Sequence, residues 1–240
     1  MRFKNQYRWL VVTSLAMLGA CAGPPPTEPT RDLGVPVASP SAYLSSQPAT
    51  IYRIDPEASK LHILVYRGGT LARLGHNHVI SSRSISGSMW RGTSLQDSGF
   101  AMTVPVNALI VDDNDARTAE GEDFPLNVTE DAKQGTKTNM LRDTLLDGAR
   151  YPNVSIQSVN LQGDTNAPQV LATLRIKDQS RQIAVPVTLQ SADGSLRAKG
   201  EFEIKQSDFG ITPLSVALGA LLVLDTIKIK FELVANAYTP

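Results

Sequence analysis

Alternation of apolar and polar residues with a period of two is the feature that most limits what this chain can fold into. Near the C-terminus the apolar positions are Ile227, Ile229, Phe231 and Leu233, and the residues between them are Lys228, Lys230 and Glu232. Successive side chains of a β-strand point to opposite faces, so this spacing puts the apolar residues on one face and the charged residues on the other. The pattern predicts a strand that is buried on one face.

Four earlier segments repeat this alternation. Their apolar positions are Phe100, Met102, Val104 and Val106; Val170, Ala172, Leu174 and Ile176; Ile183, Val185, Val187 and Leu189; and Phe202 with Ile204. The Asp178-Gln179-Ser180 break and the Asp193-Gly194 pair lie between segments, where hairpin turns are expected. Several antiparallel strands leave sheet edges that must be protected, and closure removes them. We therefore predict an all-β fold, an antiparallel barrel of about eight strands.

One interval lacks the alternation. Residues 112–137 are polar and rich in acids, which predicts a long inserted loop. After it, Met140, Leu141, Thr144 and Leu145 recur at helical spacing and predict one short helix. Gly148 is placed to end that helix, and Pro152 prevents its continuation.

The N-terminus has the pattern of a bacterial lipoprotein signal. Arg2, Lys4 and Arg8 precede an apolar stretch that is too short to span a bilayer, and the small residues Gly19 and Ala20 come directly before the single cysteine, Cys21. We predict a signal peptide over residues 1–20 and lipid attachment to Cys21, which would anchor the protein to a membrane facing the periplasm. Ala22 follows the cysteine, where an aspartate often signals inner-membrane retention, so the outer membrane is favoured. An ordinary secretory signal with an incidental cysteine is the alternative.

A proline-rich segment follows the cysteine. Residues 21–50 contain seven prolines and few large apolar residues, so this segment cannot bury enough surface to fold. Proline-rich chains extend by about 3.1 Å per residue, which makes the segment a tether. We place the folded domain at residues 51–236.

Charge and composition exclude several functions. The chain has 23 basic and 23 acidic residues, and no basic stripe with interleaved aromatics, so a nucleic-acid partner is not expected. With one cysteine, the domain must be held together by its core instead of by disulfides. There is no Gly-x-Ser-x-Gly elbow, and Asp208-Phe209-Gly210 lacks the other motifs of a kinase. We find no catalytic constellation and predict a protein that is not an enzyme; the oligomeric state cannot be derived from these residues.

An ordered set of short motifs resembles the YceI-like family. The motifs are Tyr52-Arg53-Ile54-Asp55, Ser84 to Gly87, Leu141-Arg142-Asp143, Tyr151-Pro152 and Ser207-Asp208-Phe209-Gly210-Ile211, and the resemblance covers roughly Ile51 to Ala235. It implies a lipocalin-like barrel in the bacterial periplasm that encloses the tail of a polyisoprenoid, such as an isoprenoid quinone or a prenyl pyrophosphate. It also implies carriage or storage of that bound lipid, with no cofactor required.

A barrel of eight strands is wide enough either to fill with its own side chains or to hold one slender ligand. The predicted apolar lining of such a cavity is Phe100, Met102, Val104, Phe202, Ile204, Ile229 and Phe231. Plain core packing is the competing role for each of them. The almost wholly apolar stretch from Leu214 to Leu224 has the composition of a core strand, although its small residues could leave room for a guest. Composition does not decide between a filled and a hollow barrel.

The three histidines are the basis of a second hypothesis, a polar or metal-binding site. Gly75-His76-Asn77-His78 departs from the commoner glycine-and-phenylalanine segment of the family, and the 112–137 segment is longer than expected there. If residues 76–78 form a strand, both imidazoles share a face and could meet an anionic headgroup at the barrel mouth, together with Arg73 and Arg83. Alternatively, His62, His76 and His78 could supply three ligands to a metal ion. In a turn, the rings need not converge, and backbone and water would satisfy them.

Overall fold

The structure is a computed structural model that describes residues 49–238. The predicted signal peptide, Cys21 and almost all of the predicted tether lie outside the described residues. All described residues belong to the second of the two units into which the chain divides, Gly34–Pro240. Between residues 49 and 238, no helix is both long enough and apolar enough to cross a membrane.

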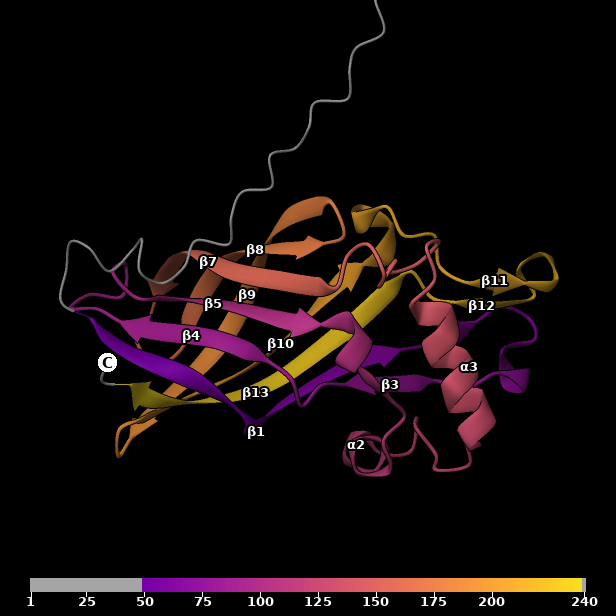
Figure 1. Cartoon of the computed structure of the whole chain (residues 1–240), viewed down its shortest axis with the longest axis horizontal. Coiled ribbons are helices and arrows are strands. Elements are labelled where there is room, and N and C mark those ends of the chain that lie inside the picture. The colour runs from indigo at the N-terminus through magenta and orange to yellow at the C-terminus, as the bar shows by residue number, and fades with distance from the viewer. Residues whose placement is uncertain (1–48, 239–240) are drawn as a thin grey trace, which may run out of the picture. The chain divides into compact units, whose positions relative to one another are not determined.

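Within this described part, eight antiparallel strands form a closed barrel (Figure 1). In barrel order they are β1 (Thr50–Val65), β4 (Ser86–Arg91), β5 (Gly99–Pro105), β7 (Asn153–Gly163), β8 (Pro168–Ile176), β9 (Gln179–Ala192), β10 (Ser195–Lys205) and β13 (Thr226–Tyr238). The barrel closes because β13 pairs with β1 as well as with β10, in a register that places Ile51 opposite Tyr238. The predicted fold class is confirmed.

The barrel has two different ends, which follow from the direction of its strands. At the end that we call the hairpin end, β4 joins β5, β7 joins β8, and β9 turns into β10 through Asp193 and Gly194, both with positive φ. This φ pair is the conformation expected for the Asp-Gly turn predicted there. At the other end, which we call the helix end, lie the long connections between β1 and β4, between β5 and β7, and between β10 and β13.

Smaller strands extend the barrel at the helix end. The strands β3 (His78–Ser81) and β6 (Ile110–Val111) continue the main sheet beyond the second half of β1, while β11 (Ser215–Val216), β12 (Leu221–Val223) and β2 (Arg67–Gly68) form a separate sheet. Four 3-10 helices occur in the described chain: η1 (Ala72–Leu74), η2 (Val106–Ala108), η3 (Gln206–Phe209) and η4 (Ala217–Gly219). The segment from Leu214 to Leu224 is therefore a short hairpin, and four of its large apolar side chains are exposed. It is not the core strand that its composition suggests.

The predicted loop between Asp112 and Lys137 holds one of the two α-helices of the described chain and most of the other. These are α2 (Asn114–Glu120) and α3 (Glu130–Met140). Asp113 caps α2 by accepting hydrogen bonds from the N–H groups of Asp115 and Ala116, and Thr129 caps α3 in the same way through Ala132. The single helix predicted over residues 140–145 is wrong, since α3 ends at Met140 and turns follow. Gly148 therefore ends no helix.

The predicted alternation is confirmed along the long strands. On β8, Val170, Ala172, Leu174 and Ile176 are buried, and the residues between them are more exposed. The hairpin turn between β8 and β9 lies at Lys177 and Asp178, one residue earlier than predicted, and Lys177 takes a positive φ there. The inward faces of the eight strands surround the interior in which the candidate site lies.

Candidate functional site

The barrel encloses a cavity of about 520 Å³. Its wall includes residues from the hairpin end, such as Trp90 and Ser94, and from the helix end, such as Met140 and Leu214, so the cavity follows the length of the barrel. Volumes between about 300 and 1,000 Å³ are typical of sites for small molecules and cofactors. Most of the wall is aliphatic or aromatic, which suits an apolar guest.

All seven residues predicted as apolar lining lie in the cavity wall. Phe100, Met102 and Val104 come from β5, Phe202 and Ile204 from β10, and Ile229 and Phe231 from β13. All seven point into the barrel, yet only Ile204 and Ile229 are buried, and the other five are half-buried. Inward-facing side chains keep accessible surface only where the interior is not filled, so the barrel is hollow at these positions. Their contact with a ligand stays a prediction.

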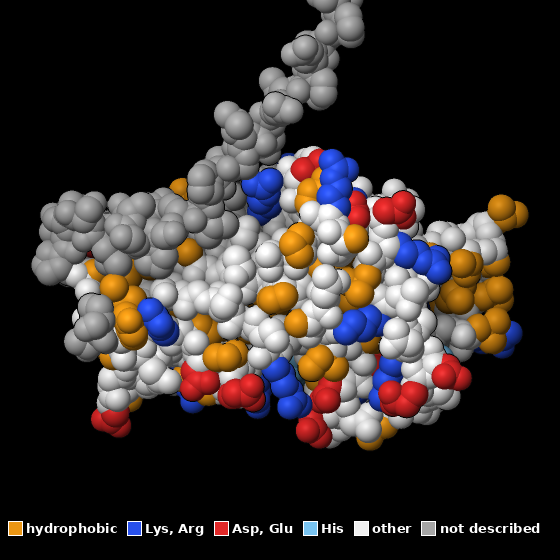
Figure 2. All heavy atoms as spheres, in the orientation of Figure 1, with side chains coloured by type: hydrophobic (Ala, Val, Ile, Leu, Met, Phe, Trp, Pro, Cys, Tyr) orange, Lys and Arg blue, Asp and Glu red, His pale blue; other side chains and the backbone are white. Residues whose placement is uncertain are grey.

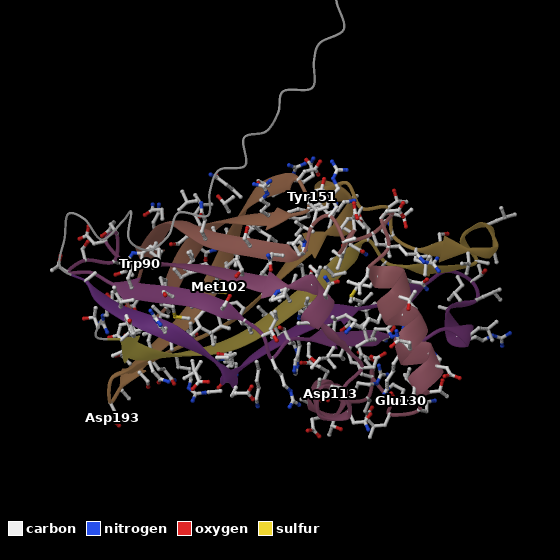
Figure 3. The ribbon with its side chains drawn as sticks, in the orientation of Figure 1. Trp90, Met102, Asp113, Glu130, Tyr151 and Asp193 are labelled. Atoms are coloured by element: carbon white, nitrogen blue, oxygen red, sulfur yellow. The ribbon has the colours of Figure 1, made fainter. Side chains whose placement is uncertain are left out.

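Sequence reasoning missed the hairpin end of the cavity. Trp90 and Arg91 at the end of β4 belong to the wall, with Ser94 from the following loop and Asn166 from the β7–β8 loop. Figure 3 places Trp90 toward this end and Met102 farther along the barrel. The loop residues are polar and show no periodicity from which a place in the wall could be predicted. Trp90 could have been predicted as a wall residue, because large aromatic side chains near the end of a strand are usually buried.

At the helix end, His78 is the one predicted headgroup residue that lies in the cavity wall. It pairs with Val65 across β1 and β3, and residues paired in this way share a face, so both point inward. The Nδ1 atom of His78 lies 2.6 Å from Oδ2 of Asp112. The imidazole is therefore held in place by a carboxylate, with its ring beside the cavity.

Asp112 is the centre of a buried polar network. Its side chain has no exposed surface, accepts a hydrogen bond from the N–H of Val79 at 2.9 Å and pairs with the equally buried guanidinium of Arg117. Burial disfavours the charged carboxylate, but the hydrogen bond and charge of His78, with the bonds from Val79 and Arg117, outweigh it and hold the pKa of Asp112 below its usual value. The network fastens α2 to β3, and thereby fixes His78.

His62 lies on the opposite face of the same strands. It pairs with Ser81 of β3 and Lys230 of β13, and its Nδ1 atom lies 2.7 Å from Oε1 of Glu120 at the end of α2. Lys230 donates to the other oxygen of Glu120 at 2.6 Å. Burial disfavours the charged Glu120 carboxylate, yet Lys230 and His62 outweigh this and lower its pKa. These contacts hold α2 against the outside of the barrel.

The structure does not assemble His62, His76 and His78 into a metal site. His62 faces outward and His78 inward, because they occupy positions of opposite parity on paired strands. His76 precedes β3 in a loop, with its ring centroid 6.4 Å from that of His78. Among residues 49–238, no three histidine, cysteine or acidic side chains are grouped so that they could hold a metal ion.

The remaining predicted headgroup residues lie outside the cavity wall. Arg73 is exposed on η1. Arg83 is exposed after β3 and lies 3.8 Å from Asp113, the cap of α2. Neither these arginines nor His76 contributes to the wall, and His78 alone of this set borders the cavity.

A closed antiparallel barrel with an apolar interior cavity defines the class of this protein as a small β-barrel of the ligand-enclosing type. The YceI-like domain model matches residues 52–235, which is most of the chain. The chain therefore belongs to the YceI-like family, as its motifs predicted. Among curated proteins, no significant match was found.

Two solved structures share the fold. BcnA from Burkholderia cenocepacia is 18% identical, with a TM-score of 0.57, and the match covers 76% of this chain and 99% of BcnA. A polyisoprenoid binding domain from Saccharophagus degradans, described as implicated in plant cell wall breakdown, is 14% identical with a TM-score of 0.52 and covers 78% of this chain and 98% of that one. Almost the whole of each of these two structures is therefore matched by this chain, which shows that they share its fold.

Proposed function

We propose that this protein binds a polyisoprenoid lipid, such as an isoprenoid quinone or a prenyl pyrophosphate, and carries or stores it in the bacterial periplasm. The observation that carries the proposal is the elongated apolar cavity inside the barrel. The family membership and the polyisoprenoid binding domain among its structural neighbours support the same ligand class. The role is binding, with the barrel acting as a solvent for an otherwise insoluble chain.

The energetics favour a long apolar guest. Transfer of one methylene group from water into an apolar environment contributes about 0.8 kcal/mol, and branched isoprenoid chains carry many such groups. Because the wall is preformed by paired strands, little ordering of the protein opposes binding. We expect selectivity to depend mainly on the length and width of the tail.

We place the polar head of the lipid at the helix end. His78 borders the cavity there, and its partner Asp112 fixes the position of its ring. Arg73 is an exposed cation on a connection at the same end, available to a charged headgroup through charge-assisted hydrogen bonds, whereas Arg83 would have to exchange its ion pair with Asp113 for the headgroup. A tail that extends from this end meets the lining of β5, β10 and β13.

Lipid retained during purification is the direct test. Residues 34–240, produced in a bacterial host and purified without detergent, are expected to show one bound isoprenoid per protein in native mass spectrometry. Organic extraction of the same sample should release that lipid, and a metal assay should find no stoichiometric ion. An empty protein that also fails to take up added isoprenoid, or an empty protein with one zinc or iron, would contradict the proposal.

Anchoring through Cys21 forms the second part of the proposal. The full chain with Cys21 intact is expected in the membrane fraction, labelled by a fatty acid analogue, because multiple acyl chains anchor a protein stably. The Cys21→Ser variant should lose the label. A full chain that is never labelled, or a Cys21→Ser variant that is still labelled, would contradict acylation at Cys21 and leave the lipid-binding proposal unaffected.

A further inference from the structure

The hairpin at the helix end carries an exposed apolar surface. The exposed large side chains there are Leu74, Leu214, Val216, Leu218 and Leu224, which we call the apolar tip. Figure 1 shows β11 and β12 projecting beyond α3, and Figure 2 shows hydrophobic side chains gathered over them. Contiguous exposed apolar surface of this kind usually marks contact with a protein or with a membrane.

The tip is held in a fixed shape. Val216 pairs with Leu221 between β11 and β12, and Val223 pairs with Arg67 of β2. Gly69 has a φ of +90°, and a Cβ atom there would lie 2.4 Å from the carbonyl oxygen of Ala220, so only glycine lets β2 approach the hairpin so closely. The apolar side chains are therefore presented by a supported hairpin.

Leu218 at the turn is fully exposed and conformationally costly. It has a φ of +55°, between Ala217 at +50° and Gly219 at +87°. A leucine in this left-handed conformation costs about 1 kcal/mol or more, and Leu218 belongs to none of the core clusters of residues 49–238, whose packing could offset the cost. Strain of this kind persists most often where a functional surface requires it.

The charged residues around the apolar tip indicate which kind of partner it contacts. The segments Arg67–His76 and Ile211–Leu224 contain no acidic residue, whereas Arg67 and Arg73 flank the hairpin. The nearest acid in sequence, Asp225, is bound to the N–H and hydroxyl groups of Ser207. Apolar side chains with flanking arginines and no acids complement a bilayer that exposes anionic phosphates above an apolar interior.

We propose that the apolar tip docks the helix end of the barrel onto an anionic lipid surface, with Leu218 inserted and Arg73 beside the phosphates. Leu214 and Val223 belong both to the hairpin segment and to the cavity wall, so a docked barrel would bring its cavity to the bilayer from which an apolar ligand must come. This second step rests on the proposed lipid-binding function, whereas docking itself does not.

Vesicle flotation with residues 34–240 tests the proposal, since the predicted lipid anchor is absent from them. Binding is expected to vesicles of phosphatidylethanolamine with phosphatidylglycerol, weaker to phosphatidylcholine alone, and reduced by salt. Leu218→Asp is expected to weaken binding by about tenfold or more, because the burial of one leucine is lost. Arg73→Glu should have a similar effect that disappears at high salt.

Matched substitutions elsewhere serve as controls. Leu126→Asp changes another exposed leucine, on the α2–α3 loop, and Lys199→Glu reverses an exposed cation on β10. Both should bind vesicles like the unchanged protein. Equal binding by Leu218→Asp, absence of binding by the unchanged protein, or a dimer that Leu218→Asp dissociates would overturn the proposal. Retention of isoprenoid in native mass spectrometry, measured on the same samples, separates failure of docking from failure of the lipid-binding function.

Discussion

Replacement of Arg117 by methionine is expected to lower the free energy of unfolding of residues 34–240 by about 3–5 kcal/mol, because it leaves the buried charge of Asp112 without its cation. The guanidinium also donates to the carbonyl oxygens of Asn77 at 2.8 Å and Pro125 at 2.7 Å, so the substitution also removes the hydrogen-bond donor of these two partly buried carbonyl groups. Urea unfolding followed by the fluorescence of Trp90, the one tryptophan in this fragment, measures the change.

Arg197→Met is the matched control for this prediction. Arg197 forms an ion pair with Glu232 on the outside of the barrel, where its side chain is 47% exposed. Exposed pairs contribute about 0.2–1 kcal/mol, so the control should unfold close to the unchanged protein. If both variants lost equally little stability, the network around Asp112 would not be what holds α2 and His78 in place.

Replacement of Ala198 by phenylalanine is expected to weaken the binding of long isoprenoid chains by about tenfold or more. Ala198 is a small residue of β10 in the cavity wall, between Leu189 and Leu233 on the neighbouring strands. A ring at this position occupies space that several methylene groups of the tail would otherwise fill, and each excluded methylene forfeits about 0.8 kcal/mol. Titrations followed by Trp90 fluorescence, with isoprenoid alcohols of increasing length, measure the loss.

The length of the isoprenoid distinguishes blockage of the cavity from general destabilisation of the protein. A short isoprenoid that does not reach Ala198 should retain its affinity, whereas overpacking costs about 1–3 kcal/mol of stability whatever the ligand. Ala184→Phe introduces the same ring on the exposed face of β9 and should leave every titration unchanged. Unaltered binding of the longest chain by Ala198→Phe would place the ligand outside the barrel.

The barrel could be predicted from the sequence because its strands are buried on one face only. Ile227, Ile229 and Phe231 alternate with charged residues, and the structure places them on the inner face of β13. The same alternation predicts the seven lining residues, since they are the apolar members of three such strands. It could not show that the interior is hollow, because this depends on how far apart opposite walls stand and on which inward side chains remain accessible.

The helices could not be predicted by the same reasoning. In the described structure α3 buries none of its residues, so it has no apolar stripe that periodicity could detect. Only the start of α3 could have been predicted, because Thr129 is a favoured N-cap residue and the acidic residues Glu130 and Asp131 follow it in the first turn. The apolar spacing after Met140 predicted a helix that is not there. Leu141, Leu145 and Leu146 do pack against the barrel core, but they do so from a series of turns.

The histidines show the limit of arguments from spacing. His76 and His78 are two apart, which predicts a common face only on a strand, and the strand begins at His78. The position of His62 relative to them depends on the register between β1 and β3, a long-range property that no local pattern contains. The apolar tip was missed for a related reason, since composition alone does not tell a buried strand from an exposed hairpin.

Closure of the barrel through β1 and β13 also affects how the domain folds during its synthesis. Among the strands of residues 49–238, the first to be synthesised, β1, pairs with the last, β13, so Ile51 can pair only after Tyr238 has been added. Contacts between such distant residues slow folding, and until they form both edge strands remain open to other chains. A nascent or truncated chain that lacks β13 is thus an aggregation hazard, and holding chaperones would protect it until its final thirteen-residue strand arrives.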